Sequence, residues 1–246
     1  FDPFPVGNLN ENSMEEVFNG EKMNQLRSRM LKNEKSRECM KCYDQEKSGF
    51  FSLRLSSNKH FGHNVPLVHN TLPDGKADFV MKYWDIRFSN LCNMACRSCG
   101  TWFSSNWYED HKKLTGSPPP HAKIMKVGRT TNDMWEQMLE QFEHTEQFYF
   151  AGGEPIIMEE HYRILKELDK RKMYHVRLIY NTNFSKTTFK DIDVFEHLKL
   201  DDTLVRFCAS MGKAERIKNT VFPVTYRLYL HFIIYIFLVT LSFALA

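Results

Sequence analysis

Three cysteines stand close together in the segment SNLCNMACRSCG, residues 89–100. Cys92, Cys96 and Cys99 follow a C-x3-C-x2-C spacing, which is typical of a metal site or of redox chemistry. A closed structural zinc site needs four ligands, and the nearest downstream candidate for the fourth is His111. A redox disulfide would leave one of the three cysteines unexplained. An iron–sulfur cluster is held by thiolates, and a four-iron cluster with three cysteine ligands leaves one iron open to a small molecule.

A second motif, GGEP at residues 152–155, follows an apolar run that is typical of a strand. A glycine has no Cβ, so a ligand can approach its backbone closely. Together with the cysteine loop, this motif resembles the radical S-adenosylmethionine (radical SAM) enzymes. The resemblance implies a [4Fe-4S] cluster on Cys92, Cys96 and Cys99, with S-adenosylmethionine at the open iron. It also implies that the glycines and Glu154 hold the amino group of the cofactor. The cofactor-binding candidates in this motif are Gly152, Gly153 and Glu154.

Three further positions are cofactor-binding candidates through the same resemblance. Ser98 stands where the family usually has an aromatic residue, in backbone contact with adenine. Asn183 follows the third expected strand. Ser210 follows the fourth, where related enzymes have Ser-x-Asp-Gly; here no acidic residue stands between Ser210 and Gly212.

Strand-like and helix-like patterns alternate from Asp78 onward, which favours a parallel sheet or barrel of β/α units. We expect strands at 83–90, 146–155, 175–185 and 203–210, and helices at 130–144, 158–172 and 189–199. The expected fold class is α/β: a partial (β/α)6 radical SAM barrel of about four units, preceded by a small cysteine-containing α-rich segment. The motifs fall at the carboxyl ends of the strands, where active residues of such folds collect. Asp85 and Arg87 alternate on the first strand, and inside a barrel each charge would need a partner.

The start of the chain carries a resemblance of its own. A Gly-Asn turn at 7–8, a helix capped by Ser13 and Glu16, and the pair Cys39 and Cys42 resemble the closing half of a SPASM or twitch module. Such modules hold an auxiliary iron–sulfur cluster and occur in peptide-modifying radical SAM enzymes. This resemblance implies a second cluster and a peptide substrate. The alternative for the two cysteines is half of a zinc knuckle or a pair of free thiols.

The last part of the chain changes character. Residues 228–246 are almost all apolar, and nineteen helical residues would span about 28 Å, close to the thickness of a bilayer core. A C-terminal membrane anchor is one interpretation, with the main domain on the cytoplasmic side because basic residues precede the tail; they are Lys213, Arg216, Lys218 and Arg227. The other interpretation is a divergent or out-of-frame extension, and we expect a chain that is incomplete at both ends.

The predicted organisation is a SPASM/twitch-like segment at 1–47, an irregular linker at 48–77, the partial barrel at 78–212 and the apolar tail at 213–246. The net charge of the 246 residues is +3 with both signs interspersed, which does not favour a nucleic-acid partner. Five of the six cysteines stand in two tight groups, which indicates a reducing compartment, so we expect a cytoplasmic protein.

The predicted function is that of a radical SAM oxidoreductase or peptide-modifying enzyme. The cluster would cleave S-adenosylmethionine reductively to a 5′-deoxyadenosyl radical, which would abstract hydrogen from the substrate. A small electron donor of the flavodoxin or ferredoxin type is the expected partner. The alternatives are a zinc-bound interaction domain and a non-functional fragment. No general acid, base or nucleophile stands out in the sequence.

Overall fold

The computed structural model describes residues 5–96, 99–127, 131–186, 188–190 and 192–193. It divides into two compact units, Phe1–Thr182 and Asn183–Ala246. The helices of the first unit are α1 (Met14–Phe18), α2 (Glu21–Leu31), α3 (Met40–Lys47), α4 (Leu53–Phe61), α5 (Trp107–Thr115), α6 (Thr131–Gln141) and α7 (Glu159–Lys170). Four short 3-10 helices accompany them: η1 (Arg37–Cys39), η2 (Gly62–Asn70), η3 (Phe142–His144) and η4 (Pro155–Ile157).

A three-stranded parallel sheet positions the site. Its strands β1 (Tyr83–Ile86), β2 (Gln147–Phe150) and β3 (Arg177–Tyr180) lie in sequence order. Tyr83 is opposite Gln147, and Gln147 is opposite Arg177, so the three strands are in one register. The first three predicted strands are therefore confirmed, and their carboxyl ends meet at one edge.

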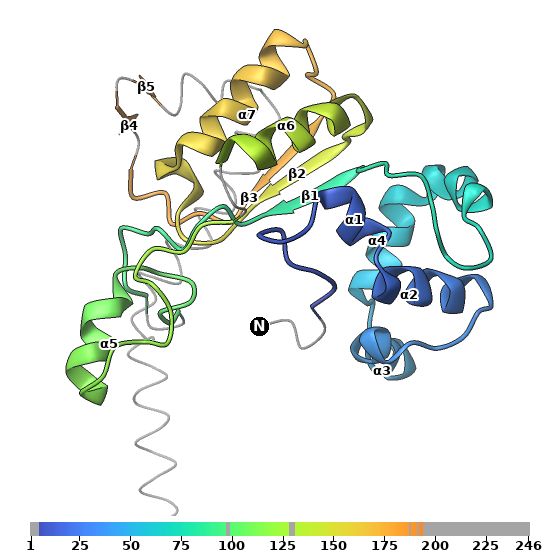
Figure 1. Cartoon of the computed structure of the whole chain (residues 1–246), viewed down its shortest axis with the longest axis horizontal. Helices are drawn as coiled ribbons and strands as arrows, with labels where there is room; N and C mark the ends of the chain where they lie inside the picture. Colours follow the sequence, from blue (N-terminus) through green and yellow to red (C-terminus); the bar gives the residue numbers. More distant parts are fainter. Residues whose placement is uncertain (1–4, 97–98, 128–130, 187, 191, 194–246) are drawn as a thin grey trace, which may run out of the picture. The chain divides into compact units, whose positions relative to one another are not determined.

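One face of this sheet is covered by α6 and α7 (Figure 1). Aromatic rings run across it from strand to strand: Trp84 stacks on Phe148 with centroids 6.2 Å apart, and Phe150 stacks on Tyr180 at 5.1 Å. The Trp84 indole N–H donates to the hydroxyl of Thr145 at 2.9 Å, so the ring is buried with its polar atom satisfied. The helices predicted at 130–144 and 158–172 are found as α6 and α7, and their buried apolar side chains include Met134, Met138, Ile164, Leu165 and Leu168.

The described residues do not form the predicted barrel. The described residues make a mixed α/β fold with a small parallel sheet that does not close into a barrel. The fourth predicted strand, at 203–210, lies outside the described residues.

The predicted helix at 189–199 is wrong over its described part, which belongs to the second unit. There β4 (Thr188–Phe189) and β5 (Ile192–Asp193) pair antiparallel. The backbone of Lys190 has a φ of 53°, which reverses the chain between two short strands and is incompatible with a helix.

The N-terminal segment is helical, as its sequence predicts. The capping box is present: the Ser13 hydroxyl accepts from the backbone N–H of Glu16, and the Glu16 carboxylate accepts from the N–H of Ser13. The predicted continuous helix is two helices, because the chain leaves α1 at Asn19 and α2 starts after Gly20.

Residues 48–77 are not the irregular connection that their composition predicts, because they contain α4 and η2. Arg27 of α2 ties this segment to the helices before it. Its guanidinium donates to the carbonyls of Gly75 at 2.6 Å and Phe18 at 2.7 Å, and also to the side-chain oxygens of Asn19 and Asn24. A single side chain thus satisfies four acceptors from both sides of the predicted boundary.

Replacing Arg27 by alanine should lower the free energy of unfolding by about 2 kcal/mol, because hydrogen bonds to a charged group are lost and their acceptors stay partly buried. Urea denaturation of the full chain measures this loss. Arg29→Ala is the matched control: Arg29 makes an exposed ion pair with Glu38 at 3.2 Å, and such a pair contributes under about 1 kcal/mol. Equal effects of the two variants would contradict the role given to Arg27.

Candidate metal and cofactor site

The cysteine loop begins at the carboxyl end of β1 and is held by the residues that follow it. The backbone N–H of Cys92 donates to the Ser105 hydroxyl at 3.3 Å. The Ser104 hydroxyl donates to the carbonyl of Met94 at 2.6 Å, and the indole of Trp107 donates to the carbonyl of Cys96 at 2.9 Å. The sequence did not lead us to predict these anchors. The pair Ser104 and Ser105 shortly after the cysteine loop is nevertheless a visible signal of side-chain hydrogen bonds to the backbone.

The three thiols of this loop differ in burial. Cys92 is buried, Cys96 half-buried and Cys99 exposed, and all three are free thiols. Among the described residues, no three side chains of His, Cys, Asp or Glu lie close enough together to hold a metal ion. The assignment of the three cysteines as cluster ligands therefore stays a prediction, and Ser98 lies outside the described residues.

The glycine motif after β2 packs directly on the cysteine loop. Gly152 and Gly153 have φ values of 76° and 52°, in the left-handed region that favours glycine. A Cβ on Gly153 would lie 2.2 Å from the carbonyl oxygen of Leu91. The N–H of Glu154 donates to this same oxygen at 2.8 Å. These glycines thus permit close contact between two segments of the same chain, whereas the sequence predicted the close approach of a ligand.

Glu154 connects the ends of β2 and β3. Its side chain is only 1% exposed. The carboxylate accepts from the N–H of Ile156 at 3.3 Å and from the hydroxyl of Thr182, which directly follows the end of β3. Burial, with a smaller contribution from the charge of Glu154, raises the pKa of Tyr162 well above its usual range. Of the residues after β3, the sequence singled out Asn183 and not Thr182, which directly precedes it.

The other two cofactor candidates, Asn183 and Ser210, lie beyond the first unit in the sequence. Asn183 belongs to the second unit, where its side-chain oxygen accepts from the N–H of Ser185 at 2.9 Å. Ser210 lies outside the described residues. The predictions made for both residues remain untested.

The open face of the sheet is polar. Asp85 lies in β1, and Arg87 directly follows this strand. The two side chains make an ion pair, with Nε of Arg87 3.1 Å from Oδ1 of Asp85. This hydrogen bond to Asp85 raises the pKa of the guanidinium. Burial, followed by the charge of Asp85, raises the pKa of Tyr83 on the same face. These charges are not inside a barrel among the described residues: the side chains of Arg87 and Asp85 are 51% and 41% exposed, and they pair with each other.

The N-terminal cysteines lie in a basic and aromatic setting. Cys39 ends η1 and Cys42 lies in α3, and both are half-buried free thiols. The ring of Tyr43 lies 5.6 Å from the Lys35 ammonium and 5.4 Å from the Arg54 guanidinium. Two ligands alone would not complete a cluster.

Comparison with known families gives two matches. Residues 1–43 match SPASM, an iron-sulfur cluster-binding domain, and residues 151–246 match Bestrophin_2, the Bacterial/Fungal Bestrophin protein family. No match to a radical SAM domain is found. No curated protein and no solved structure matches the chain. The N-terminal segment is therefore a SPASM iron–sulfur cluster-binding segment, which supports the resemblance seen at Cys39 and Cys42.

None of the helices in the described part of the chain has both the length and the apolar character needed to cross a bilayer. The apolar residues 228–246 lie outside that part.

Replacing Gly153 by alanine should push the cysteine loop away from the end of β2. The new Cβ would collide with the Leu91 carbonyl, and the left-handed backbone is unfavourable for alanine. We expect a loss of about 2 kcal/mol or more in unfolding free energy and faster alkylation of the buried Cys92. Urea denaturation and mass-resolved alkylation measure the two effects.

Gly100→Ala is the control, because a Cβ on Gly100 would meet nothing within 4 Å. If both variants alkylate at the wild-type rate at Cys92, the glycine turn does not hold the loop in place.

Proposed function

We propose that this chain is part of a radical SAM enzyme with its SPASM segment on the N-terminal side of the catalytic sheet. One observation carries the proposal: an iron–sulfur cluster-binding segment at 1–43 precedes a C-x3-C-x2-C loop at the carboxyl end of a parallel strand. SPASM domains are typical of radical SAM enzymes. The enzymatic activity itself is the proposed step.

The donor set fits an iron–sulfur cluster. Cys92, Cys96 and Cys99 lie on one loop and form no disulfide, and thiolates are the ligands such clusters require. The backbone of this loop is anchored at Ser105 and Trp107. In the proposed enzyme these cysteines would hold the cluster, and Cys39 and Cys42 would supply two ligands of a second one.

The glycine turn and Glu154 fit the amino group of S-adenosylmethionine. The carboxylate of Glu154 lies buried beside this turn, where it accepts from the N–H of Ile156 and from the hydroxyl of Thr182. Burial strengthens the attraction between a carboxylate and a cationic amino group. Glu154 would bind this group and orient it toward the cysteine loop, which its own N–H contacts at Leu91.

Once bound, the cluster and S-adenosylmethionine would supply one-electron radical chemistry that removes a hydrogen atom from the substrate. The chain itself would position the two groups and exclude water. We further propose a peptide substrate, a flavodoxin or ferredoxin as electron donor and a cytoplasmic location, because these follow from the radical SAM and SPASM resemblances.

Anaerobic reconstitution with iron and sulfide tests this function. The full chain should take up iron, show the visible absorbance of an iron–sulfur cluster, and change its electron paramagnetic resonance spectrum when S-adenosylmethionine is added. Cys92→Ser should abolish the signal that responds to S-adenosylmethionine. The double variant Cys39→Ser/Cys42→Ser should retain that signal, because these residues belong to the other cluster.

A colourless protein with one zinc per chain would instead identify a zinc-bound interaction domain. Iron uptake without any response to S-adenosylmethionine would also contradict the proposal. Loss of the responsive signal in the double variant alone would reverse the roles given to the two cysteine groups.

A further inference from the structure

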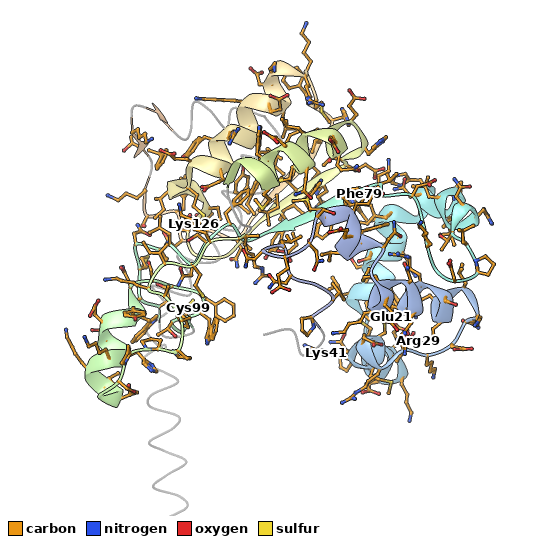
Figure 2. The ribbon with its side chains drawn as sticks, in the orientation of Figure 1. Glu21, Arg29, Lys41, Phe79, Cys99 and Lys126 are labelled. Carbon is orange, nitrogen blue, oxygen red and sulfur yellow. The ribbon has the colours of Figure 1, made fainter. Side chains whose placement is uncertain are left out.

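A small pocket opens beside the cysteine loop, at the carboxyl end of β1. We call it the loop pocket; its volume is 180 Å³, and the residues that characterise it are Arg87, Asn90, Trp102, Phe103, Lys126 and Gly152. It joins the end of β1, the segment after the cysteines and the glycine turn after β2. Figure 2 shows Lys126 and Cys99 on the loops that extend from this end of the sheet.

The wall of the loop pocket is held by Asn90. Its side-chain amide donates to the carbonyls of Thr101 and Lys123, both at 3.1 Å. The side-chain oxygen accepts from the N–H of Met125 at 2.9 Å. One buried amide therefore joins the segment after the cysteines to the segment that carries Lys126, and the pocket has fixed walls.

The segment around Lys126 is also fixed to β1 by backbone contacts. Ser89 and Lys126 form an isolated antiparallel bridge, and the N–H of Val127 donates to the carbonyl of Phe88 at 3.1 Å. Lys126 is thereby held beside Phe88 and Ser89, which directly follow Arg87 in the chain. The position of both cations is set by the backbone.

The charges of the loop pocket are positive. Arg87 and Lys126 line it, and no carboxylate does. Arg87 shares its charge with Asp85 at 3.1 Å, whereas Lys126 makes no ion pair among the described residues. An anion is therefore the complementary ligand, and a carboxylate would accept hydrogen bonds from the ammonium and from the second edge of the guanidinium.

The remaining walls are aromatic and partly exposed. The Trp102 ring lies 4.2 Å from the ring of His121, and Trp102 and Phe103 are 40% and 44% exposed. A cavity of about 150 Å³ is large enough for benzene. The loop pocket therefore has room for one side chain or one chain end, with a charged tip and an apolar stem.

We propose that the loop pocket binds a carboxylate of the substrate, either an Asp or Glu side chain or the C-terminal carboxylate of a peptide. This inference rests on the proposed function for its catalytic meaning, since the pocket borders the turn assigned to the cofactor. In the proposed enzyme the carboxylate of S-adenosylmethionine would bind the open iron. Arg87 and Lys126 would therefore bind a second carboxylate, that of the substrate. The loop pocket then selects acidic peptides and places them beside the cysteine loop.

Pairs of peptides that differ only in charge test this inference on the full chain. For the side-chain source, Ac-Gly-Glu-Gly-NH2 is compared with Ac-Gly-Gln-Gly-NH2. For the chain end, Ac-Gly-Gly-Leu-OH is compared with Ac-Gly-Gly-Leu-NH2. Binding is followed by saturation-transfer NMR and tryptophan fluorescence. In at least one pair the acid should bind about tenfold more tightly than the amide, and salt should reduce the difference.

Lys126→Gln should remove most of this preference, and Lys126→Arg should keep it, because the arginine retains the charge. Lys123→Gln is the matched control: Lys123 is three residues away, pairs with Glu109 at 3.1 Å and does not line the loop pocket. Thermal melts of all three variants should agree with the parent, since these side chains are at the surface.

Equal binding of acids and amides, or an unchanged preference in Lys126→Gln, would overturn the inference. Displacement of the acid by S-adenosylmethionine, together with weaker cofactor binding in Lys126→Gln, would also overturn it by assigning the pocket to the cofactor. The failure of the proposed function is a separate result. A chain that takes up no iron and still prefers acids would contradict the proposed enzyme and support the carboxylate site.

Discussion

The carbonyl oxygen of Leu91 is the contact on which the candidate site depends. It accepts from the N–H of Glu154 and leaves no space for a side chain on Gly153. Because β1 and β2 are parallel neighbours, the loops after them leave the sheet at the same edge and must pass each other. Two glycines let them pass in contact. The orientation of the cysteine loop is therefore set by a turn that lies about sixty residues away in the chain.

The same edge extends to the third strand through Glu154 and Thr182. A buried carboxylate is costly unless it is hydrogen-bonded, and here its partners come from η4, which follows β2, and from Thr182, two residues after β3. The opposite face of the sheet is a row of stacked aromatic rings under α6 and α7. The polar edge of the sheet is thus supported by a packed apolar layer, which favours a site that is already formed before a ligand binds.

The N-terminal segment is more than a short cysteine-bearing extension. Arg27 joins its helices to residues 73–77, and the N–H of Met14 donates to the side chain of Gln137 in α6 at 2.6 Å. The SPASM match ends at residue 43, within α3. Arg54 of α4 also lies over the ring of Tyr43 at 5.4 Å, so α4 contacts the matched segment, although neither family match covers this helix.

Local patterns were sufficient for the elements whose cause is local. The capping box at Ser13, the apolar faces of α6 and α7, and three of the strands follow from hydrogen bonding and periodicity within a few residues. The motifs themselves were also visible in the sequence, as were the charges of Asp85 and Arg87. A cysteine spacing or a pair of glycines identifies a candidate chemistry because the residue types alone limit it.

Other features depend on contacts between distant segments, and no local pattern reports them. Residues 48–77 contain α4 and η2, and Arg27 of α2 reaches the carbonyl of Gly75 in the same segment, so their polar composition was misleading. The hairpin at 188–193 needs a residue with a left-handed backbone, and a lysine at this position gives no sequence signal for that conformation. The reason for Gly153, the role of Thr182 and the pairing of Asn90 with the chain around Lys126 all appear only when the strand ends meet, because tertiary packing selects which polar groups must satisfy one another.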